Sequence, residues 1–289
     1  MTPDEYCQNK AAQSGSSFYY AFLFLPPDRR RAITALYAFC REVDDIVDEV
    51  HETSVARMKL VWWRKQVEML YEHGSAEHPV MQALAPHIAP FGLNQDHLYA
   101  IIEGMEMDLD RHRYDDWAAL RRYCWHAAGV VGELSAAIFG YTRPETLDYA
   151  QKLGLAFQMT NIIRDVGDDA RRGRIYLPLS DLKAFGVREA DILNGIYTPG
   201  FTELMKAQSE RTHALYREAM QALPAQDIRS QRPGLLMAAI YNTLLHEIDD
   251  EQWRVLDQRI SLTPIRKLWL AWKTWVSGGH GLVKRLGRP

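Results

Sequence analysis

The sequence predicts an all-α protein, a bundle of helices that forms one domain over residues 1–289. Apolar residues recur at spacings of three and four along most of the chain, and the alternation typical of half-buried strands is hard to find. Glycine and proline residues divide this pattern into segments of helical length. The chain is 47% hydrophobic and 25% charged, and no shift in composition marks a domain boundary.

The predicted helices follow one another with recognisable ends. The first begins just after Pro26-Pro27, with Asp28 as N-cap, and extends to about residue 50. Further helices are expected near 54–73, 94–111, 115–139, 144–172, 200–222, 232–256 and 263–277. Stop signals separate them: Gly74, Pro90 with Gly92, Gly140, Gly173, Pro224 and Gly278-Gly279. We expect residues 173–199 to form a loop with short helical pieces.

Charge and composition exclude several classes of protein. The net charge of −3 offers no basic footprint, so we expect no nucleic-acid partner. The cysteines Cys7, Cys40 and Cys124 form neither a zinc motif nor a disulfide framework, which fits a reducing compartment. The sequence shows no targeting segment and no apolar run of about 18 residues that could span a membrane. We therefore expect a cytoplasmic protein.

The helix predicted from Asp28 carries a charged stripe among apolar neighbours. Residues at spacings of three or four share one face of a helix. The stripe consists of Tyr37, Arg41, Asp44 or Asp45, and Asp48. A solvated acidic patch with Arg–Asp pairs within the helix is the alternative interpretation of this segment.

A second stripe of amide and carboxylate oxygens lies on the helix predicted over 144–172. It consists of Gln158, Asn161, Asp165, and Asp168 or Asp169, again among apolar neighbours. Two such helices in one chain favour a functional site over two solvated patches. Mg²⁺ prefers oxygen ligands and is held by carboxylates together with substrate phosphates. Magnesium ions between the two stripes would bind a diphosphate and stabilise its departure as an allylic cation forms. Arg41 and Arg164 lie close enough to bind the remaining phosphate oxygens.

The residues that carry this pattern resemble the squalene/phytoene synthases, which join isoprenyl diphosphates head to head. The similarity extends from about Ser14 to Arg259. Its motifs are Asp44-Asp45-Ile-Val-Asp48 and Asn161-Ile-Ile-Arg-Asp165-Val-Gly-Asp168-Asp169, the latter followed by Arg174-Ile-Tyr176-Leu-Pro178. The segments 16–20 and 40–45 look most like bacterial presqualene diphosphate synthases of hopanoid pathways.

The resemblance implies an isoprenoid-synthase bundle around a central apolar cavity, and a role for each matching residue. The implied Mg²⁺ ligands are Asp44, Asp48, Asn161, Asp165 and Asp169. The implied diphosphate contacts are Tyr37, Arg41, Gln158, Arg164, Tyr241 and Arg259. Tyr123 and Tyr176 match aromatic positions near the reacting carbons, and Ser14, Gly15, Ser16 and Ser17 match a stretch that lines the substrate. Among these residues, Tyr37, Arg41, Tyr123 and Tyr176 are the expected catalytic side chains.

The resemblance also implies a reaction. One farnesyl diphosphate ionises, its C1 is attacked by the C2–C3 double bond of a second, and loss of a proton closes the cyclopropane of presqualene diphosphate. The base is either the released diphosphate or a tyrosine. The segment 232–241 looks more like phytoene-type relatives than like the enzymes that reduce with NADPH, so we expect no NADPH cofactor. The alternatives are a dehydrosqualene, squalene or phytoene synthase, and a non-catalytic lipid-binding or assembly relative.

Two further groups of residues invite a functional reading. Glu103, Glu106, Asp108 and Asp110 are spread around their helix, which favours a solvated face. The ten histidines contain no HxxxH pair on a helix and are expected to be structural or exposed.

The segment 258–289 is basic and rich in tryptophan. It holds seven Lys or Arg residues and no Asp or Glu. Leu268, Trp269, Trp272 and Trp275 recur at helical spacings. Such a helix either lies at the surface of a membrane, here the inner membrane, or packs its tryptophans against the bundle. The sequence leaves both interpretations open and identifies no protein partner.

Overall fold

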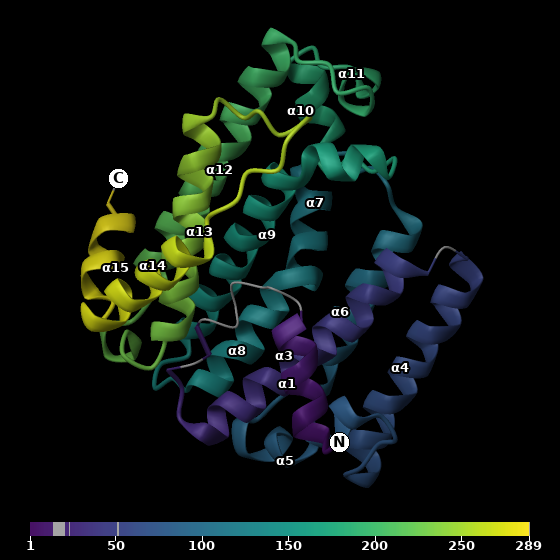
Figure 1. The fold of residues 1–289 in the computed structure, drawn as a ribbon, viewed down its shortest axis with the longest axis vertical. Coiled ribbons are helices and arrows are strands. Elements are labelled where there is room, and N and C mark those ends of the chain that lie inside the picture. The colour runs from purple at the N-terminus through teal and green to yellow at the C-terminus, as the bar shows by residue number, and fades with distance from the viewer. Residues whose placement is uncertain (14–20, 23, 51, 289) are drawn as a thin grey trace.

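The computed structural model describes residues 1–13, 21–22, 24–50 and 52–288, and within these ranges it contains helices and no strand (Figure 1). The longer helices are α1 (Pro3–Gln13), α3 (Pro27–Glu49), α4 (Thr53–His73), α5 (Pro79–Phe91), α6 (Gln95–Asp110), α7 (Trp117–Cys124), α8 (Val130–Phe139), α9 (Glu145–Arg171), α12 (Pro199–Ala222), α13 (Arg232–Asp250) and α14 (Pro264–Val276). The shorter pieces are α10 (Leu179–Ala184), α11 (Glu189–Leu193), α15 (His280–Leu286), a π-helical turn (Trp125–Gly129) and a 3₁₀ turn (Ala225–Asp227). The prediction of an all-α bundle is confirmed.

Most predicted helices are present with ends displaced by a few residues. The segment predicted over 115–139 is α7 and α8 joined by the π-helical turn, and 173–199 holds the short helices α10 and α11. Asp28 does not cap α3, because the N-cap is Pro26. Asp28 lies instead in the first turn, where its negative charge interacts favourably with the helix dipole.

Among the described residues, three helices were not predicted: α1, α5 and the short α15. Helix α5 contains Pro86 and Pro90, and an interior proline usually costs a helix about 3 kcal/mol. Burial of one face, including Met81 and Leu84, against α1 and α3 outweighs this cost. Helix α13 is shorter than expected, because Gln252 and Trp253 adopt left-handed backbone conformations with φ of 52° and 54° and turn the chain.

Helix α9 is central to the bundle and contacts α7, α8, α11, α12 and α13 (Figure 1). Two glycines permit the close approach of its neighbours. A Cβ atom at Gly132 would lie 2.3 Å from the carbonyl oxygen of Ala150, and one at Gly154 would lie 2.4 Å from that of Ala128. The backbone of α9 therefore packs in direct contact with the backbone of α8 and of the π-helical turn that precedes it.

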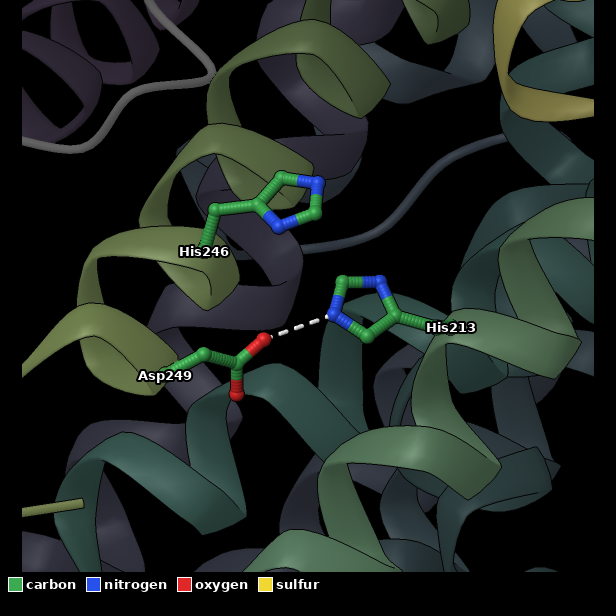
Figure 2. Close-up of side chains that lie close together, drawn as sticks. All are labelled: His213, His246 and Asp249. Atoms are coloured by element: carbon green, nitrogen blue, oxygen red, sulfur yellow. Dashed lines mark hydrogen bonds and ion pairs between the residues drawn. The ribbon is translucent and has the colours of Figure 1, made fainter. Parts of the chain in front are cut away.

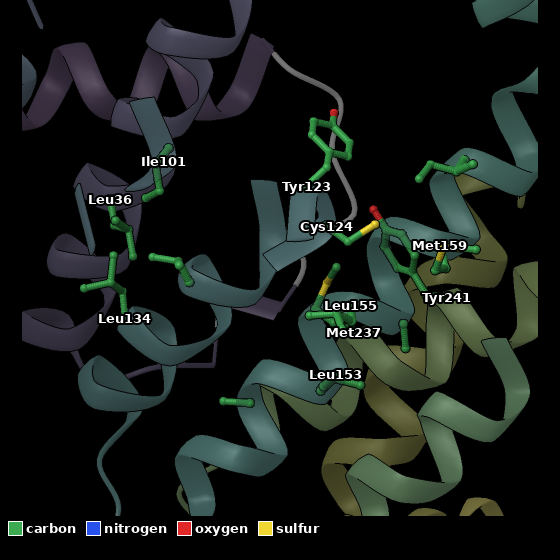
Figure 3. Packing of buried hydrophobic residues seen from close by; sticks show 14 of the residues in the cluster. Leu36, Ile101, Tyr123, Cys124, Leu134, Leu153, Leu155, Met159, Met237 and Tyr241 are labelled. Atoms are coloured by element: carbon green, nitrogen blue, oxygen red, sulfur yellow. The ribbon is translucent and has the colours of Figure 1, made fainter. Parts of the chain in front are cut away.

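Within the core cluster of buried apolar residues, Figure 3 shows two groups of labelled side chains on opposite sides of the view. Leu36, Ile101 and Leu134 come from α3, α6 and α8, and Leu153, Leu155, Met159, Met237 and Tyr241 come from α9 and α13. A cavity lies between the groups, because Leu36 and Ile101 line it from one side and Leu153 and Met237 from the other.

The C-terminal segment folds back over the bundle. After α13 the chain crosses α9, where the Gly167 amide donates a hydrogen bond to the Val255 carbonyl oxygen at 3.1 Å. Helix α14 then packs against α13, and α15 packs against α12 (Figure 1). In the described part of the chain, no helix combines the length and apolar character needed to cross a membrane.

Candidate active site

The cavity has a volume of about 900 Å³ and combines an apolar part with a strongly charged part. The apolar wall includes Phe22, Leu36, Val131, Phe139, Leu153 and Met237. The charged wall carries acidic residues from α3, α6 and α9, and basic residues from α3, α9 and the segments that follow α9 and α13. The volume is at the upper end of the range of about 300–1,000 Å³ for small-molecule sites.

The two predicted stripes of polar residues, one on α3 and one on α9, both line this cavity and are called the oxygen stripes below. Helix α3 contributes Asp44 and Asp48, and α9 contributes Asn161, Asp165, Asp168 and Asp169. The stripes are also bridged directly, because Arg172 Nη1 at the end of α9 donates to Asp48 Oδ1 at 2.9 Å. The helices thus bring together two groups that are more than a hundred residues apart in sequence.

The structure distinguishes Asp44 from Asp45, which the sequence left open. Asp44 lines the cavity and accepts a hydrogen bond from Arg41 Nη1 at 2.6 Å. Asp45 points towards α1, where its Oδ2 lies 2.8 Å from Lys10 Nζ, and it also binds Arg41. Arg41 lines the cavity and is held between the two carboxylates.

Asp165 is surrounded by arginines. Arg164 Nε donates to its Oδ1 at 2.7 Å, and Arg259 Nε donates to the same oxygen at 2.9 Å. Burial by itself raises the pKa of Asp165, but the hydrogen bonds and charges of Arg164 and Arg259 outweigh burial and hold the pKa below its usual value. Asp165 is therefore ionised at neutral pH.

Asp44 and Asp169 have the opposite character. Burial raises the pKa of Asp44 to about 6, with Arg41 opposing the shift. Burial, followed by the charges of Asp165 and Asp108, raises the pKa of Asp169 to about 7. Burial and the neighbouring carboxylates thus disfavour the charged forms of Asp44 and Asp169, and a cation bound between them would favour those forms.

The donor set suits a hard divalent cation. It consists of carboxylate oxygens and one amide oxygen, the ligand types that Mg²⁺ prefers. Asn161 Oδ1 is buried and has no hydrogen-bond partner among the described residues. A buried acceptor without a partner costs free energy, and a cation would satisfy it. The residues present therefore fit a magnesium site made by Asp44, Asp48, Asn161, Asp165 and Asp169.

Asp108 contradicts the expectation of a solvated face. It is buried at the cavity wall and accepts hydrogen bonds from Tyr123 Oη and Tyr176 Oη, both at 2.7 Å. Burial raises its pKa to about 6. The signal in the sequence is its helical spacing from the buried Ile101 and Met105, which places Asp108 on the apolar face of α6.

The other acids of that helix follow the expectation. Arg64 binds the half-buried Glu106 through Nη2 at 2.8 Å and approaches the exposed Glu103, and Arg57 binds the exposed Asp110. The tyrosines that hold Asp108 belong to the predicted site. Their rings stack with centroids 5.3 Å apart, and burial raises the pKa of both hydroxyls well above the usual value.

The remaining predicted residues are largely gathered at the same cavity. Tyr37, Gln158 and Tyr241 line it, and the Tyr241 ring lies 4.9 Å from that of Phe157. Ser14, Gly15, Ser16 and Ser17 lie outside the described residues. Among the described residues, four cations that sequence reasoning did not assign also line the cavity: Arg171, Arg172, Arg174, which lies 3.8 Å from Asp48, and Lys267 of α14.

Comparisons with known proteins match this chain along most of its length. The family model for squalene/phytoene synthase matches residues 11–266. A phytoene synthase of Arthrospira platensis is 35% identical over 277 residues, covering 91% of this chain and 89% of the relative. A 15-cis-phytoene synthase of Synechocystis sp. is 33% identical over 283 residues, covering 93% of this chain and 84% of the relative.

Solved structures agree in fold. A dehydrosqualene synthase crystallised with a ligand superposes with a TM-score of 0.85 at 26% identity, covering 95% of this chain and 96% of its own. The squalene synthase HpnC from Alicyclobacillus acidocaldarius superposes with a TM-score of 0.79 at 28% identity, covering 87% of this chain and 94% of its own.

Proposed function

This chain belongs to the squalene/phytoene synthase family, whose members condense isoprenyl diphosphates head to head, and we propose that it converts two molecules of farnesyl diphosphate to presqualene diphosphate with Mg²⁺. The observation that carries the proposal is the pairing of the oxygen stripes of α3 and α9 at one end of an apolar cavity. That pairing provides a place for diphosphate and metal beside a place for hydrocarbon.

In this proposal the charged residues bind the metal and the diphosphate, and the apolar residues bind the hydrocarbon chains. Mg²⁺ held by Asp44, Asp48, Asn161, Asp165 and Asp169 would supply Lewis-acid stabilisation of the leaving diphosphate. Arg41, Arg164 and Arg259 bind diphosphate oxygens, because guanidinium groups form paired hydrogen bonds to phosphate. The apolar wall orients the two chains and excludes water from the cation.

The hydrogen bonds around Asp108 bear on the choice of base. Tyr123 and Tyr176 both donate to this carboxylate. Because burial raises the pKa of both hydroxyls, neither is a ready proton acceptor. We therefore assign to the released diphosphate the proton that is lost as the cyclopropane closes, and to the two tyrosines the positioning of aromatic faces beside the cation.

A second candidate is phytoene synthesis from two molecules of geranylgeranyl diphosphate. It is favoured by the curated relatives, which are phytoene synthases of 35% and 33% identity. The two candidates share the metal and diphosphate chemistry and differ in the length of chain that the cavity accepts.

Product analysis separates these functions. Purified protein is incubated with Mg²⁺ and either farnesyl or geranylgeranyl diphosphate, with and without NADPH, and the products are analysed before and after phosphatase treatment. Presqualene alcohol that appears only after phosphatase, with no C30 hydrocarbon even with NADPH, supports the proposal. If squalene, dehydrosqualene or phytoene forms without phosphatase, that compound is the product in place of presqualene diphosphate. Folded protein without Mg²⁺-dependent turnover favours a non-catalytic relative.

Helix α14 supports a second part of the proposal, contact with a membrane. Trp275 packs on the bundle, since its ring stacks on Phe24 with centroids 4.9 Å apart. Trp269 and Trp272 are instead 52% and 57% exposed. They form one apolar face together with the exposed residues Ile265, Leu268 and Val276.

Basic residues accompany this apolar face, and Lys273 Nζ lies 4.7 Å from the centre of the Trp269 ring. A basic helix with an exposed Trp face is suited to the headgroup region of a bilayer with anionic lipids. We propose that α14 holds the enzyme at the membrane surface. Because Lys267 of the same helix lines the cavity, this position would place the active site beside its lipid substrate and product.

A further inference from the structure

A cluster of possible metal ligands lies between α12 and α13. Figure 2 shows His213 on α12 facing His246 and Asp249, which are one turn apart on α13. Their ligand atoms all lie within 4.8 Å of one another. None of the three lines the described cavity. The cluster is therefore separate from the oxygen-rich site and has a different donor chemistry.

The carboxylate of Asp249 is oriented by its neighbours. Its Oδ1 accepts hydrogen bonds from Ser209 Oγ and from Trp253 Nε1, the latter at 2.9 Å. Its Oδ2 faces His213 Nε2 at 2.8 Å. One oxygen is thus held by the protein and the other is directed at the imidazoles, an arrangement typical of a monodentate carboxylate ligand with outer-shell support.

The two imidazoles are also placed as ligands. Their ring centres are 4.7 Å apart with the planes tilted by 30°. The buried Asn242 amide contacts Nδ1 of His213 at 3.4 Å, so that a half-turn of the amide would let Nδ1–H donate to its oxygen while Nε2 binds a metal. Burial, followed by the charge of His213, lowers the pKa of His246, which favours the neutral form that coordinates metals.

A surface His–Asp ion pair would account for His213 and Asp249 alone. A metal would also engage the second imidazole, because the ligand atoms of all three side chains lie within 4.8 Å of one another. We propose that His213, His246 and Asp249 form a binding site for a transition-metal dication of the zinc type. On binding, the metal takes the place of the hydrogen bond between His213 Nε2 and Asp249 Oδ2, and the imidazole keeps its proton on Nδ1. His246 is exposed, so a fourth position remains accessible to water.

Such a metal would stabilise the turn that follows α13. Asp249 is bound by Trp253, one of the two residues with left-handed backbone at the start of the segment leading to Arg259. The metal would join this turn to α12 through His213. Metal binding should therefore raise the midpoint of thermal unfolding, because a ligand of the folded state stabilises it.

The test is a calorimetric titration of Zn²⁺ into chelator-treated protein. Excess Mg²⁺ is present to occupy the carboxylate site, because imidazole ligands favour Zn²⁺ whereas carboxylate and water ligands suit Mg²⁺. We expect saturation at one Zn²⁺ per chain. Co²⁺ in place of Zn²⁺ should give the intense visible absorption of a four-coordinate site. His246→Ala should weaken Zn²⁺ binding at least about tenfold and leave the circular dichroism spectrum unchanged.

Two controls distinguish this cluster from other sites. His73→Ala removes an exposed histidine on α4 and should leave Zn²⁺ binding intact. Asp165→Asn removes a carboxylate of the cavity and should also leave it intact. The proposal is overturned if Zn²⁺ does not saturate at one ion per chain, if binding survives both His246→Ala and His213→Gln, or if it is lost in Asp165→Asn. These readouts require no turnover, so they are independent of the proposed reaction.

Discussion

Arg259 Nε donates a hydrogen bond to Asp165 Oδ1 at 2.9 Å, although the two residues are separated by 94 positions. Arg164, beside Asp165 in sequence, binds the same oxygen at 2.7 Å. The segment that carries Arg259 is held on α9 by the hydrogen bond between the Gly167 amide and the Val255 carbonyl oxygen. The charged end of the cavity is therefore completed by Arg259, which lies in the segment that follows α13.

Replacing Arg259 should weaken substrate binding more than the chemical step. We expect Arg259→Gln to raise KM for the diphosphate by about 10- to 100-fold, the effect of losing a hydrogen bond between charged groups, with a smaller change in kcat. Steady-state kinetics over a range of substrate concentrations measures this split. Arg254→Gln removes an arginine of similar exposure that binds Asp257, and it should leave both constants unchanged. A fall confined to kcat would contradict the assignment.

Gly167 should tolerate no side chain. A Cβ atom there would lie 2.3 Å from the Leu256 carbonyl oxygen and 2.5 Å from that of Val255. Gly167→Ala should destabilise the protein by about 1–3 kcal/mol, the usual cost of overpacking, and should lower activity by displacing Arg259. Urea denaturation measures the first effect. Gly281→Ala is the matched control, because a Cβ atom there meets nothing within 4 Å. Equal stability of the two variants would be inconsistent with the packing described.

The cavity carboxylates of Asp44 and Asp165 should be essential for turnover if the chain is an enzyme. We expect Asp44→Ala and Asp165→Ala each to lower kcat by more than about 100-fold, because several kcal/mol of charge stabilisation depends on the metal they hold. Asp148→Ala is the control, since Asp148 is an exposed acid of α9 that pairs with Lys152. Retention of the biological function in both carboxylate variants would favour a non-catalytic relative.

The buried carboxyl group of Asp108 should make the free energy of unfolding depend on pH. Its pKa is raised from 3.8 to about 6 in the folded protein, chiefly by burial. The folded state therefore holds this proton more tightly than the unfolded state. The associated stability is fully present below pH 3.8 and is lost as the pH rises through 6.

The corresponding experiment compares the parent with Asp108→Asn. Histidines with lowered pKa values, such as His78 and His87, titrate in the same window with the opposite sign, but they are common to both proteins. Between pH 4 and 7 the parent should lose about 2 kcal/mol relative to the variant, which is most of the effect expected at about 1.36 kcal/mol per unit of pKa shift. Urea denaturation at several pH values measures the difference. A constant difference would show that Asp108 does not titrate in this range.

The exposed face of α14 should mediate membrane binding. Trp269→Glu combined with Trp272→Glu should abolish sedimentation with anionic liposomes, because it places negative charge on the face that would enter the headgroup region. Met58→Glu with Val61→Glu makes the same change in charge at exposed apolar residues of α4 and should bind as the parent does. Liposome binding that is equal in the two double variants would exclude α14 as the contact.

The positions of the two oxygen stripes could be predicted because they depend on local spacing. Asp44 and Asp48, or Asn161 and Asp165, are four apart, and the period of the α-helix alone places each pair on one face. The same argument, applied to Asp108 together with Ile101 and Met105, would have revealed the buried carboxylate on α6. Helix α5 was missed for a different reason, since the packing that supports its prolines involves helices distant in sequence.

The sequence by itself determined the helical class, the two oxygen-rich faces and the basic, tryptophan-containing tail, because each follows from interactions within a few residues. Only the tertiary structure decided which acid faces the cavity and which turns away, as Asp44 and Asp45 do. It also decided that Tyr123 and Tyr176 hold Asp108, that Trp275 is covered while Trp269 is exposed, and that Arg259 reaches Asp165. These contacts join segments as far apart in sequence as Phe24 and Trp275, and their formation depends on how whole helices pack rather than on the residues beside them.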